Sequence, residues 1–384
     1  MGEEQVDLVI AGGGPAGMMA GLLFARAGVR TVVIEKHSDF LRDFRGDTVH
    51  PSTLRIFDEL GLLDRFLERP HDKVRSVGAY VGDRHFKVAD FSRLSRRWGF
   101  IAMVPQWDFL DFVADDARTY PNFSLLMEAE ALRLIEAEGR VEGVVARVGG
   151  EERQLRARLT IAADGRGSVL RAQSGLPRRS LGAPIDVFWF RMPKRPTPEN
   201  DTTGIFAAGR IIALIDRGDY WQCAYVFAKG EAERVKARGL EAFRDEVARL
   251  THRFEPDLSE VRSWDDVRLL TVALDRLDKW HRPGLLVIGD AAHAMSPVGG
   301  VGINVAIQDA VAAANLLAAP LDEGRDVDAL LERVERRRKL PVRLVQAFQA
   351  AAQKRIIAPL LSGAATQVRP PLALRLMDRF ALLR

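Results

Sequence analysis

The chain has 384 residues, enough for two or three domains or one interleaved pair, and enough to bury a large cofactor. Its 47% hydrophobic and 28% charged residues are ordinary for a soluble enzyme, no apolar run reaches the roughly 18 residues of an integral membrane helix, and one cysteine excludes an intramolecular disulfide. The net charge is +4, but the sequence has no nucleic-acid reading motif and no metal-ligand set, so we expect neither nucleic acid nor metal to bind. The N-terminus lacks the features of a signal peptide, so we expect a cytoplasmic protein.

The N-terminal segment has the pattern of a βαβ unit. Residues 6–10 are apolar and predict a short strand, residues 15–27 are small and apolar and predict a helix, and residues 31–34 predict a second strand. Glu35 ends that second strand, where a carboxylate can accept hydrogen bonds from a ribose hydroxyl. The order of elements therefore favours dinucleotide binding.

Three glycines stand between the first strand and the helix. Gly12, Gly14 and Gly17 follow the GxGxxG spacing, in which the first makes a tight turn, the second lets a pyrophosphate approach, and the third lets helix and strand pack closely. The helix N-terminus adds unpaired N–H groups and the positive end of a dipole. We expect Pro15 and Ala16, at the helix start, to belong to the same site.

Two later apolar strands each lead into a loop of unusual composition. Residues 159–163 precede DGRGSVLR, residues 164–171, and residues 285–288 precede GDAAHAMSPVGGVGIN, residues 289–304. A helix is expected from about Ile303. Glycine costs conformational entropy on folding, so the four glycines of the second loop indicate that bare backbone is needed there.

Taken together, GxGxxG, DGxxSxxR and GDxxHxxxPxxGxGxN resemble the FAD-dependent aromatic hydroxylases, the single-component flavoprotein monooxygenases typified by p-hydroxybenzoate hydroxylase. The resemblance covers about residues 5–320. It implies that the two glycine clusters hold opposite halves of one FAD, with Asp290 on the ribityl or pyrophosphate side and residues 299–304 against the flavin ring. It also implies that His293 holds the loop and is not catalytic.

The resemblance extends to residues outside the three motifs. Arg45 in DFRGDTVHPST, with Arg42 nearby, matches an arginine after the second strand, and a guanidinium can bind pyrophosphate oxygens bidentately. Gln106 in VPQWDFL matches a glutamine, and Asp164 has either a cofactor-linked role or a turn-forming one. The expected cofactor-binding residues are Gly12, Gly14, Pro15, Ala16, Gly17, Glu35, Arg42, Arg45, Gln106, Asp164, Asp290, Gly300, Gly302, Ile303 and Asn304.

The middle of the chain predicts a β-sheet. PIDVFWFRM, GRIIALI and YWQCAYVF predict strands, residues 216–219 predict a hairpin turn between the last two, and helical periodicity is confined mainly to residues 231–250. Alternation sets Trp221, Cys223, Tyr225 and Phe227 on one face, which is either core or the lining of a substrate cavity that the resemblance implies beneath the sheet. The substrate candidates are Trp189, Arg191, Trp221, Tyr225 and Pro297.

The expected fold is α/β, with a Rossmann-type FAD-binding domain interleaved with a mainly β substrate domain. The FAD-binding domain is expected over residues 1–177 and 281–320, and the substrate domain over residues 178–280. A helical segment, residues 321–384, is expected to follow them. That segment is basic, with twelve Lys or Arg against three Asp or Glu from Leu331 to the end. We expect one long helix broken near Pro341 and a last short one over residues 369–384. These helices are expected to pack on the FAD domain or a second subunit, as in a homodimer, with an anionic membrane surface as the alternative.

The resemblance implies an NAD(P)H-dependent monooxygenase. NADPH or NADH would reduce FAD, O2 would give a flavin C4a-hydroperoxide, and an aromatic or polyketide-like small molecule would be hydroxylated. No side chain is assigned a catalytic role, because the cofactor carries the chemistry. The chain lacks a second GxGxxG, so the nicotinamide would dock transiently, and it lacks the WxWxIP signature of flavin halogenases. A reductase, dehydrogenase or epoxidase of the same fold, and a non-catalytic flavin- or ligand-binding protein, are the alternatives.

Overall fold

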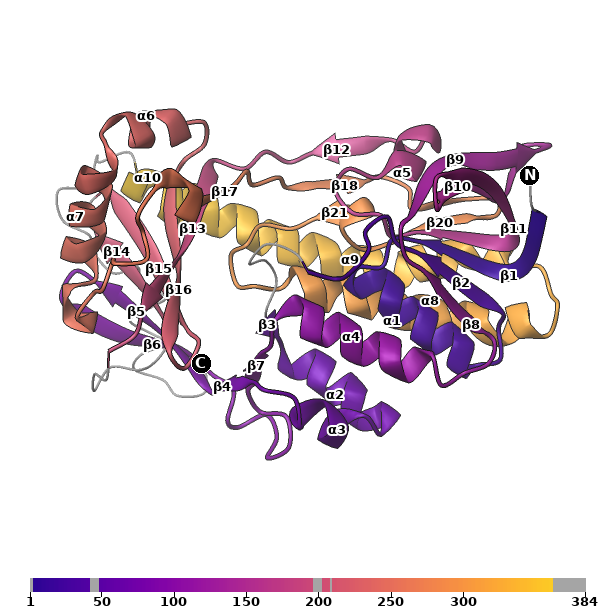
Figure 1. The fold of residues 1–384 in the computed structure, drawn as a ribbon, viewed down its shortest axis with the longest axis horizontal. Helices are drawn as coiled ribbons and strands as arrows, with labels where there is room; N and C mark the ends of the chain where they lie inside the picture. Colours follow the sequence, from indigo (N-terminus) through magenta and orange to yellow (C-terminus); the bar gives the residue numbers. More distant parts are fainter. Residues whose placement is uncertain (1–2, 42–47, 196–201, 208, 362–384) are drawn as a thin grey trace. The chain divides into compact units, whose positions relative to one another are not determined.

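Two compact units make up the computed structural model, which describes residues 3–41, 48–195, 202–207 and 209–361. Both units are discontinuous in the sequence, so the expected interleaving is present (Figure 1). Unit 1 comprises residues 1–48, 104–182 and 274–347, and unit 2 comprises residues 49–103, 183–273 and 348–384.

Five strands of unit 1 form a parallel sheet. Its order is β20 (Leu285–Val287), β11 (Glu151–Ala162), β1 (Glu3–Ala11), β2 (Thr31–Ile34) and β8 (Phe123–Leu126). Antiparallel strands β19 (His281–Arg282), β10 (Arg140–Val148) and β9 (Ala129–Ala137) complete the sheet. Ala11 pairs with Ala162, and Ala162 with Val287, so the three loops that carry the motifs leave the same edge.

Helices cover one face of this sheet (Figure 1). Helix α1 (Pro15–Arg26) packs against both α4 (Gln106–Ala117) and α8 (Gly302–Asp322). Side chains of β10 cover the other face, where Val144 packs with Val9 and Ala11 of β1. Unit 1 also contains α5 (Val169–Gln173), the 3₁₀ turn η3 (Gly289–Ala291) and a small sheet of β12 (Arg178–Ser180), β18 (Asp275–Leu277) and β21 (His293–Ala294).

Helix α8 is a long apolar helix in the core of unit 1. It is long and apolar enough to cross a membrane, although no such helix was expected from the sequence. However, 61% of its most apolar window is buried within the fold, and small side chains such as Ala310 and Ala313 are fully buried. A buried apolar helix of this kind is what the core of a globular unit needs, and α8 has that position in unit 1.

Unit 2 is built on a seven-stranded sheet in the order β17, β13, β16, β15, β14, β5, β6. The hairpin expected at residues 216–219 joins β15 and β16. The strands are β17 (Arg268–Leu270), β13 (Ile185–Pro193), β16 (Tyr220–Ala228), β15 (Arg210–Asp216), β14 (Thr203–Ala207), β5 (Ser76–Val81) and β6 (Arg84–Asp90). The expected helical stretch 231–250 forms two helices, α6 (Ala232–Ala237) and α7 (Leu240–Leu250).

The boundaries of the units differ from those expected. Residues 49–103 group with unit 2, because β5 pairs in parallel with β14 across a long sequence separation that local periodicity does not reveal. The same segment holds α2 (Pro51–Leu60), α3 (Leu63–Leu67), β4 (Asp72–Val74) and β7 (Ile101–Met103), and β3 (Thr48–Val49) lies at its start.

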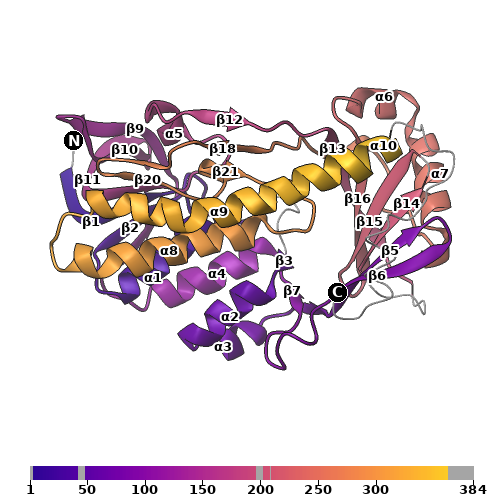
Figure 2. The ribbon, with the colours of Figure 1, turned by 180° about the vertical axis from the view of Figure 1, so that it is seen from behind.

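The helix expected to break near Pro341 does not break. Helix α9 runs from Asp328 to Ala352 with Pro341 inside it, and Figure 2 shows it beside α8. A π-helical turn (Gln353–Ile357) and α10 (Ala358–Leu361) follow. The last short helix expected over residues 369–384 lies outside the described residues.

Candidate functional site

The first glycine turn has the geometry that its spacing predicts. Gly12 has φ +106°, and a Cβ added there would lie 2.4 Å from the carbonyl oxygen of Ala163. A Cβ on Gly17 would lie 1.9 Å from the carbonyl oxygen of Gly12. Neither position can carry a side chain, so both glycines are required by close packing alone.

Gly14 differs from its two neighbours in the motif. It is the N-cap of α1 with φ −74° and ψ −178°, a backbone conformation open to any residue, and no described heavy atom lies within 4 Å of its ideal Cβ. The fold therefore does not need glycine here, whereas a ligand that approaches the backbone would. Pro15 at N1 and Ala16 continue the turn into α1, whose N-terminal dipole favours an anion.

Glu35 is held beside this turn at the end of β2. Its side chain is buried, its Oε2 accepts a hydrogen bond from Gly13 N at 2.9 Å, and its Oε1 accepts one from His37 N at 3.2 Å. A carboxylate fixed in this way at the end of the second strand is positioned for a ribose hydroxyl, as the motif predicts.

Asp164 caps α5 with one carboxylate oxygen and leaves the other unpartnered among the described residues. Its Oδ2 accepts a hydrogen bond from Val169 N at 3.0 Å, which caps α5, while its buried Oδ1 has no hydrogen-bond partner among the described residues. Burial raises the pKa of this carboxyl above its ordinary value. The residue follows β11 and adjoins Gly12, since a Cβ on Gly12 would lie 2.8 Å from Asp164 Cα. An unsatisfied oxygen at this edge suits a hydroxyl donor from a ligand.

The second motif holds the third through an arginine. Arg171 donates from Nη1 to the carbonyl oxygen of Ala291 at 3.0 Å and from Nη2 to that of Arg166 at 2.5 Å, so its role is structural. Arg166 in turn donates to Asp290 Oδ2 at 3.0 Å, and the Asp290 side chain stays one-third exposed. Asp290 thus lies at the common edge of the strands with part of its carboxylate accessible.

The glycines that follow are fixed by Thr48, which the sequence did not single out. Gly300 has φ +59°, Thr48 Oγ1 donates to its carbonyl oxygen at 2.7 Å, and a Cβ on Gly300 would lie 2.6 Å from that hydroxyl. Asn304 donates from Nδ2 to the carbonyl oxygen of Thr48 at 2.9 Å. Gly302 and Ile303 lie in the first turn of α8, where the backbone N–H groups have no partner within the helix.

A buried ionic network lies behind this loop. Asp309 of α8, fully buried, accepts hydrogen bonds from Gly289 N at 3.1 Å and from Arg338 Nε at 2.7 Å, and its Oδ2 lies 2.6 Å from His293 Nε2. Burial alone would raise the pKa of Asp309, but His293 and Arg338 outweigh it and hold the pKa below its ordinary value. His293 thus has a loop-holding geometry. Asp309 and Arg338 have no motif signal, because only the fold brings them to the loop.

The remaining cofactor candidates, and the substrate candidate Pro297, are placed less completely. Gln106 is the first residue of α4 and is half-buried. Pro297 lies in the third loop, where its carbonyl oxygen accepts a hydrogen bond from Gly300 N at 3.0 Å. Arg42 and Arg45 lie outside the described residues, so their expected roles stay predictions. Among the residues with described positions, no group of His, Cys, Asp and Glu could hold a metal ion.

The substrate candidates of unit 2 lie on opposite faces of its sheet. Trp221 and Tyr225 are buried in the core beneath α7, where Tyr225 contacts Phe243 and donates a hydrogen bond to Glu246. Because Trp221 and Tyr225 are buried in this core, neither side chain is available to a ligand. The alternation of residues along β16 defines the two faces of the sheet, but it does not tell which face α7 covers. Trp189 and Arg191 lie on the other face and are partly exposed. We therefore keep only these two as substrate candidates from the sheet.

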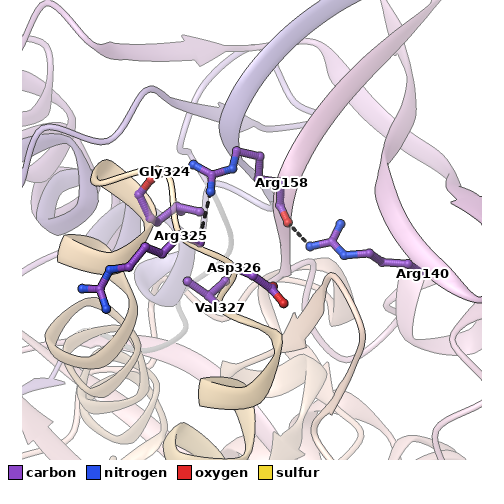
Figure 3. Close-up of a pocket in the computed structure, with 7 residues that line it drawn as sticks. Arg140, Arg158, Gly324, Arg325, Asp326 and Val327 are labelled. Atoms are coloured by element: carbon purple, nitrogen blue, oxygen red, sulfur yellow. Dashed lines mark hydrogen bonds between the residues drawn. The ribbon is translucent and has the colours of Figure 1, made fainter.

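A cavity of about 320 Å³ lies elsewhere in unit 1 (Figure 3). It is lined by Arg140, Arg158, Leu321 and residues 324–327. Its guanidinium groups bind within the fold, since Arg158 donates to the carbonyl oxygens of Leu321 and Arg325, and Arg140 to that of Arg158 and to Asp328. Arg158 also precedes the end of β11 by four residues, so this cavity is not at the edge that carries the motifs.

Comparison with known proteins agrees with this geometry. The family model described as FAD binding domain matches residues 5–348. The chain is 30% identical to 6-methylpretetramide 4-monooxygenase of Streptomyces rimosus over 337 residues, covering 87% of this chain and 80% of that protein, and 27% identical to rifampicin monooxygenase of Streptomyces venezuelae, covering 82% and 64%. This chain thus spans just under two-thirds of the second relative.

The fold also matches solved structures. The crystal structure of PqsL, a probable FAD-dependent monooxygenase from Pseudomonas aeruginosa, superimposes with a TM-score of 0.77 at 21% identity, covering 94% of this chain and 98% of that one. At this identity the likeness shows the fold alone. The match of the family model over residues 5–348 shows the family as well as the fold. The chain belongs to the FAD binding domain family, as an FAD-dependent monooxygenase.

Proposed function

We propose that this monooxygenase uses NADPH or NADH and O2 to hydroxylate an aromatic or polyketide-like small molecule. FAD, when bound, supplies both the acceptance of hydride and the activation of O2. The observation that carries the cofactor assignment is Gly14, an open position that the fold leaves free and a pyrophosphate would need. The substrate class is supported by two of the relatives, which are named as monooxygenases of 6-methylpretetramide and of rifampicin.

In this proposal the residues of unit 1 bind and orient the cofactor. The α1 N-terminus and Gly14 hold the pyrophosphate, Glu35 the ribose hydroxyls, and Asp290 a hydroxyl of the ribityl chain. The unpartnered Asp164 Oδ1 accepts a further hydrogen bond from the cofactor. The α8 N-terminus, with Gly302 at its start, stabilises negative charge on the isoalloxazine end.

One face of the unit 2 sheet supports a planar substrate. The strand register places Trp189 beside Ala224, Ala224 beside Ala213, and Ala213 beside Gly204, all on the face opposite to α7. These small side chains adjoin two aromatic rings: Trp189 at one end of the row, and Phe206, whose ring lies 2.9 Å from an ideal Cβ on Gly204. The buried indole N–H of Trp189 has no partner among the described residues. Flat aromatic ring systems pack well against such a surface, and a hydroxyl or carbonyl on them can accept from the indole.

Labelled oxygen tests the proposal. The purified protein is loaded with FAD and screened with phenols and polyketide aromatics in ¹⁸O2, with NAD(P)H oxidation followed by absorbance and products by mass spectrometry. We expect substrate-stimulated NAD(P)H oxidation and a product heavier by one ¹⁸O atom. A product without label points to a reductase or dehydrogenase, and ligand binding without turnover points to a binding protein. The cytoplasmic location and the homodimer stay predictions.

A further inference from the structure

The exposed side of α9 is not used by the proposed function. Three large apolar side chains on it are mostly exposed, Leu340 at 63%, Leu344 at 62% and Phe348 at 72%. They are spaced by four residues, so they follow one another along the same side of the helix. The other large apolar side chains that are exposed in the described residues, such as Leu94 and Leu269, are single. A continuous exposed apolar stripe of this kind marks an interaction surface.

Basic side chains border the stripe. Arg333, Arg336, Arg337 and Arg343 are all exposed, and they precede or flank Leu340 and Leu344 along the helix. From residue 333 to residue 355 the sequence has eight Lys or Arg and one acidic residue, Glu335. Glu335 is buried and paired with Lys339, so it does not neutralise the exposed side. Glu332, one residue before this range, is exposed and pairs with Arg336, and the three other arginines leave the exposed side with a net positive charge. The α9 face, defined as Leu340, Leu344 and Phe348 with these four arginines, is therefore apolar along its centre and positive at its border.

The charge of the face determines which partner it fits. A second copy of this chain would bring arginines against arginines if two such faces met, which like-charge repulsion disfavours. A nucleic acid would satisfy the arginines but would leave the leucines and Phe348 without an apolar partner. An anionic bilayer satisfies both, because headgroups attract the guanidinium groups while the apolar side chains enter the boundary between headgroups and acyl chains.

We propose that the α9 face is a docking surface for an anionic phospholipid bilayer, with α9 lying parallel to the membrane plane. The segment from Arg333 to Phe348 is roughly 22 Å long, enough for several headgroup contacts. The long arginine side chains reach the headgroups while their methylene groups cover apolar surface. Binding is peripheral and independent of the motif edge of unit 1, since none of the seven side chains belongs to the proposed cofactor site.

The test is co-sedimentation of the full-length, FAD-loaded protein with vesicles. We expect binding to vesicles that contain phosphatidylglycerol and not to pure phosphatidylcholine, with a loss as salt rises from about 0.05 M to about 0.5 M. Arg336→Gln, Arg337→Gln and Arg343→Gln together are expected to weaken binding on the order of a hundredfold, since each basic residue near an anionic surface contributes about fivefold. Arg133→Gln, Arg147→Gln and Arg153→Gln remove the same net charge on the β9 to β11 meander and are expected to lower binding far less.

Glutamine variants test the apolar stripe, because glutamine has nearly the helix propensity of leucine. Leu340→Gln, Leu344→Gln and Phe348→Gln together are expected to reduce vesicle binding at least tenfold, with unchanged thermal stability and unchanged FAD content, whereas Leu94→Gln is a control for loss of a single exposed leucine. A fall in thermal stability in the triple variant would show that another part of this chain covers the stripe and would overturn the proposal. A concentration-dependent dimer that the triple variant abolishes, without vesicle binding by the native protein, would assign the face to a second copy instead.

Discussion

Ala16 and Gly289 bring the first and third motifs into contact, because a Cβ on Gly289 would lie only 2.9 Å from Ala16 Cβ. Gly289 also has φ +61°, a conformation that non-glycine residues avoid. The loop that follows β20 is thus packed directly on the start of α1. Two glycine-rich segments at opposite ends of the sequence form one continuous surface at the edge of the parallel sheet.

Gly289→Ala is expected to destabilise the fold and to weaken FAD binding. The left-handed backbone costs about 1–2 kcal/mol with a Cβ, and the contact with Ala16 adds about 1 kcal/mol or more of overpacking. Urea unfolding measures the stability, and flavin fluorescence titration measures the affinity. Gly175→Ala is the matched control, since Gly175 has φ +69° but no described heavy atom within 4 Å of its ideal Cβ. Equal losses in the two variants would contradict the contact.

Gly14→Val is expected to weaken FAD binding on the order of a hundredfold while costing the apoprotein at most about 1 kcal/mol, the cost of replacing glycine by valine at an N-cap. The backbone of Gly14 suits any residue and the space around its Cβ is open within the fold, so the added side chain conflicts only with a ligand. Excluding the pyrophosphate from its charge-assisted hydrogen bonds costs roughly 1.5–3 kcal/mol for each bond, and hence affinity on the order of a hundredfold. A loss of apoprotein stability well above about 1 kcal/mol would show instead that the fold itself requires this glycine.

Local backbone requirements explain why the glycines of the site were predictable. Gly12 and Gly17 are dictated by φ or by close approach within one βαβ unit, and a fixed spacing records that demand in the sequence. Thr48, Asp309 and Arg338 leave no such record, because each reaches the loop from another segment through a tertiary contact. Sequence spacing cannot locate residues of that kind.

The sheet of unit 2 shows the same division between local and tertiary information. Alternation correctly separated Trp221 and Tyr225 from their neighbours, but helix α7, which covers that face, follows later in the chain. The pairing of β5 with β14 also joins distant segments, so the boundary of the unit was misplaced. The alternation of residues along a strand predicts which side chains share a face of the sheet, whereas tertiary packing determines what each face contacts.

Pro341→Ala is expected to stabilise the protein. Pro341 lies inside the continuous helix α9 and is exposed, where it removes a backbone hydrogen bond and crowds the preceding turn, at a cost of up to about 3 kcal/mol. We expect the free energy of unfolding to rise by about 1–3 kcal/mol in urea titration. Pro15→Ala is the control, because proline at N1 of α1 removes no helical hydrogen bond. No gain in Pro341→Ala would mean that the helix uses the proline to bend.

Arg338→Met is expected to destabilise the protein strongly, by about 3–5 kcal/mol, because it leaves the buried Asp309 carboxylate with less compensation. Arg147→Met, which removes an exposed ion pair with Glu130, is the control and is expected to cost at most about 1 kcal/mol. Since the pKa of Asp309 is lowered in the fold, its contribution is present above the ordinary carboxyl pKa and is lost as pH falls through the lowered value. Acid unfolding curves of native protein and variant are therefore expected to converge at low pH.

Asp164→Asn is expected to shift stability and FAD affinity in opposite directions. Burial raises the pKa of Asp164, so the folded apoprotein holds this proton more tightly than the unfolded chain does. Stability is therefore lost as pH rises from the ordinary carboxyl pKa through the raised value, and the neutral amide avoids that loss. The amide oxygen can still accept from Val169 N, which keeps the cap on α5.

The cofactor experiences the opposite effect of the same substitution. The unpartnered Asp164 Oδ1 is a charged acceptor for a cofactor hydroxyl, and an amide at that position is a weaker acceptor or turns a donor toward it. We expect FAD affinity to fall about tenfold, measured by flavin fluorescence titration, while the apoprotein becomes as stable as the native one or more so above neutral pH. Unchanged affinity would reduce Asp164 to the cap of α5, and a large loss of apoprotein stability would mean that its charge is satisfied within the fold.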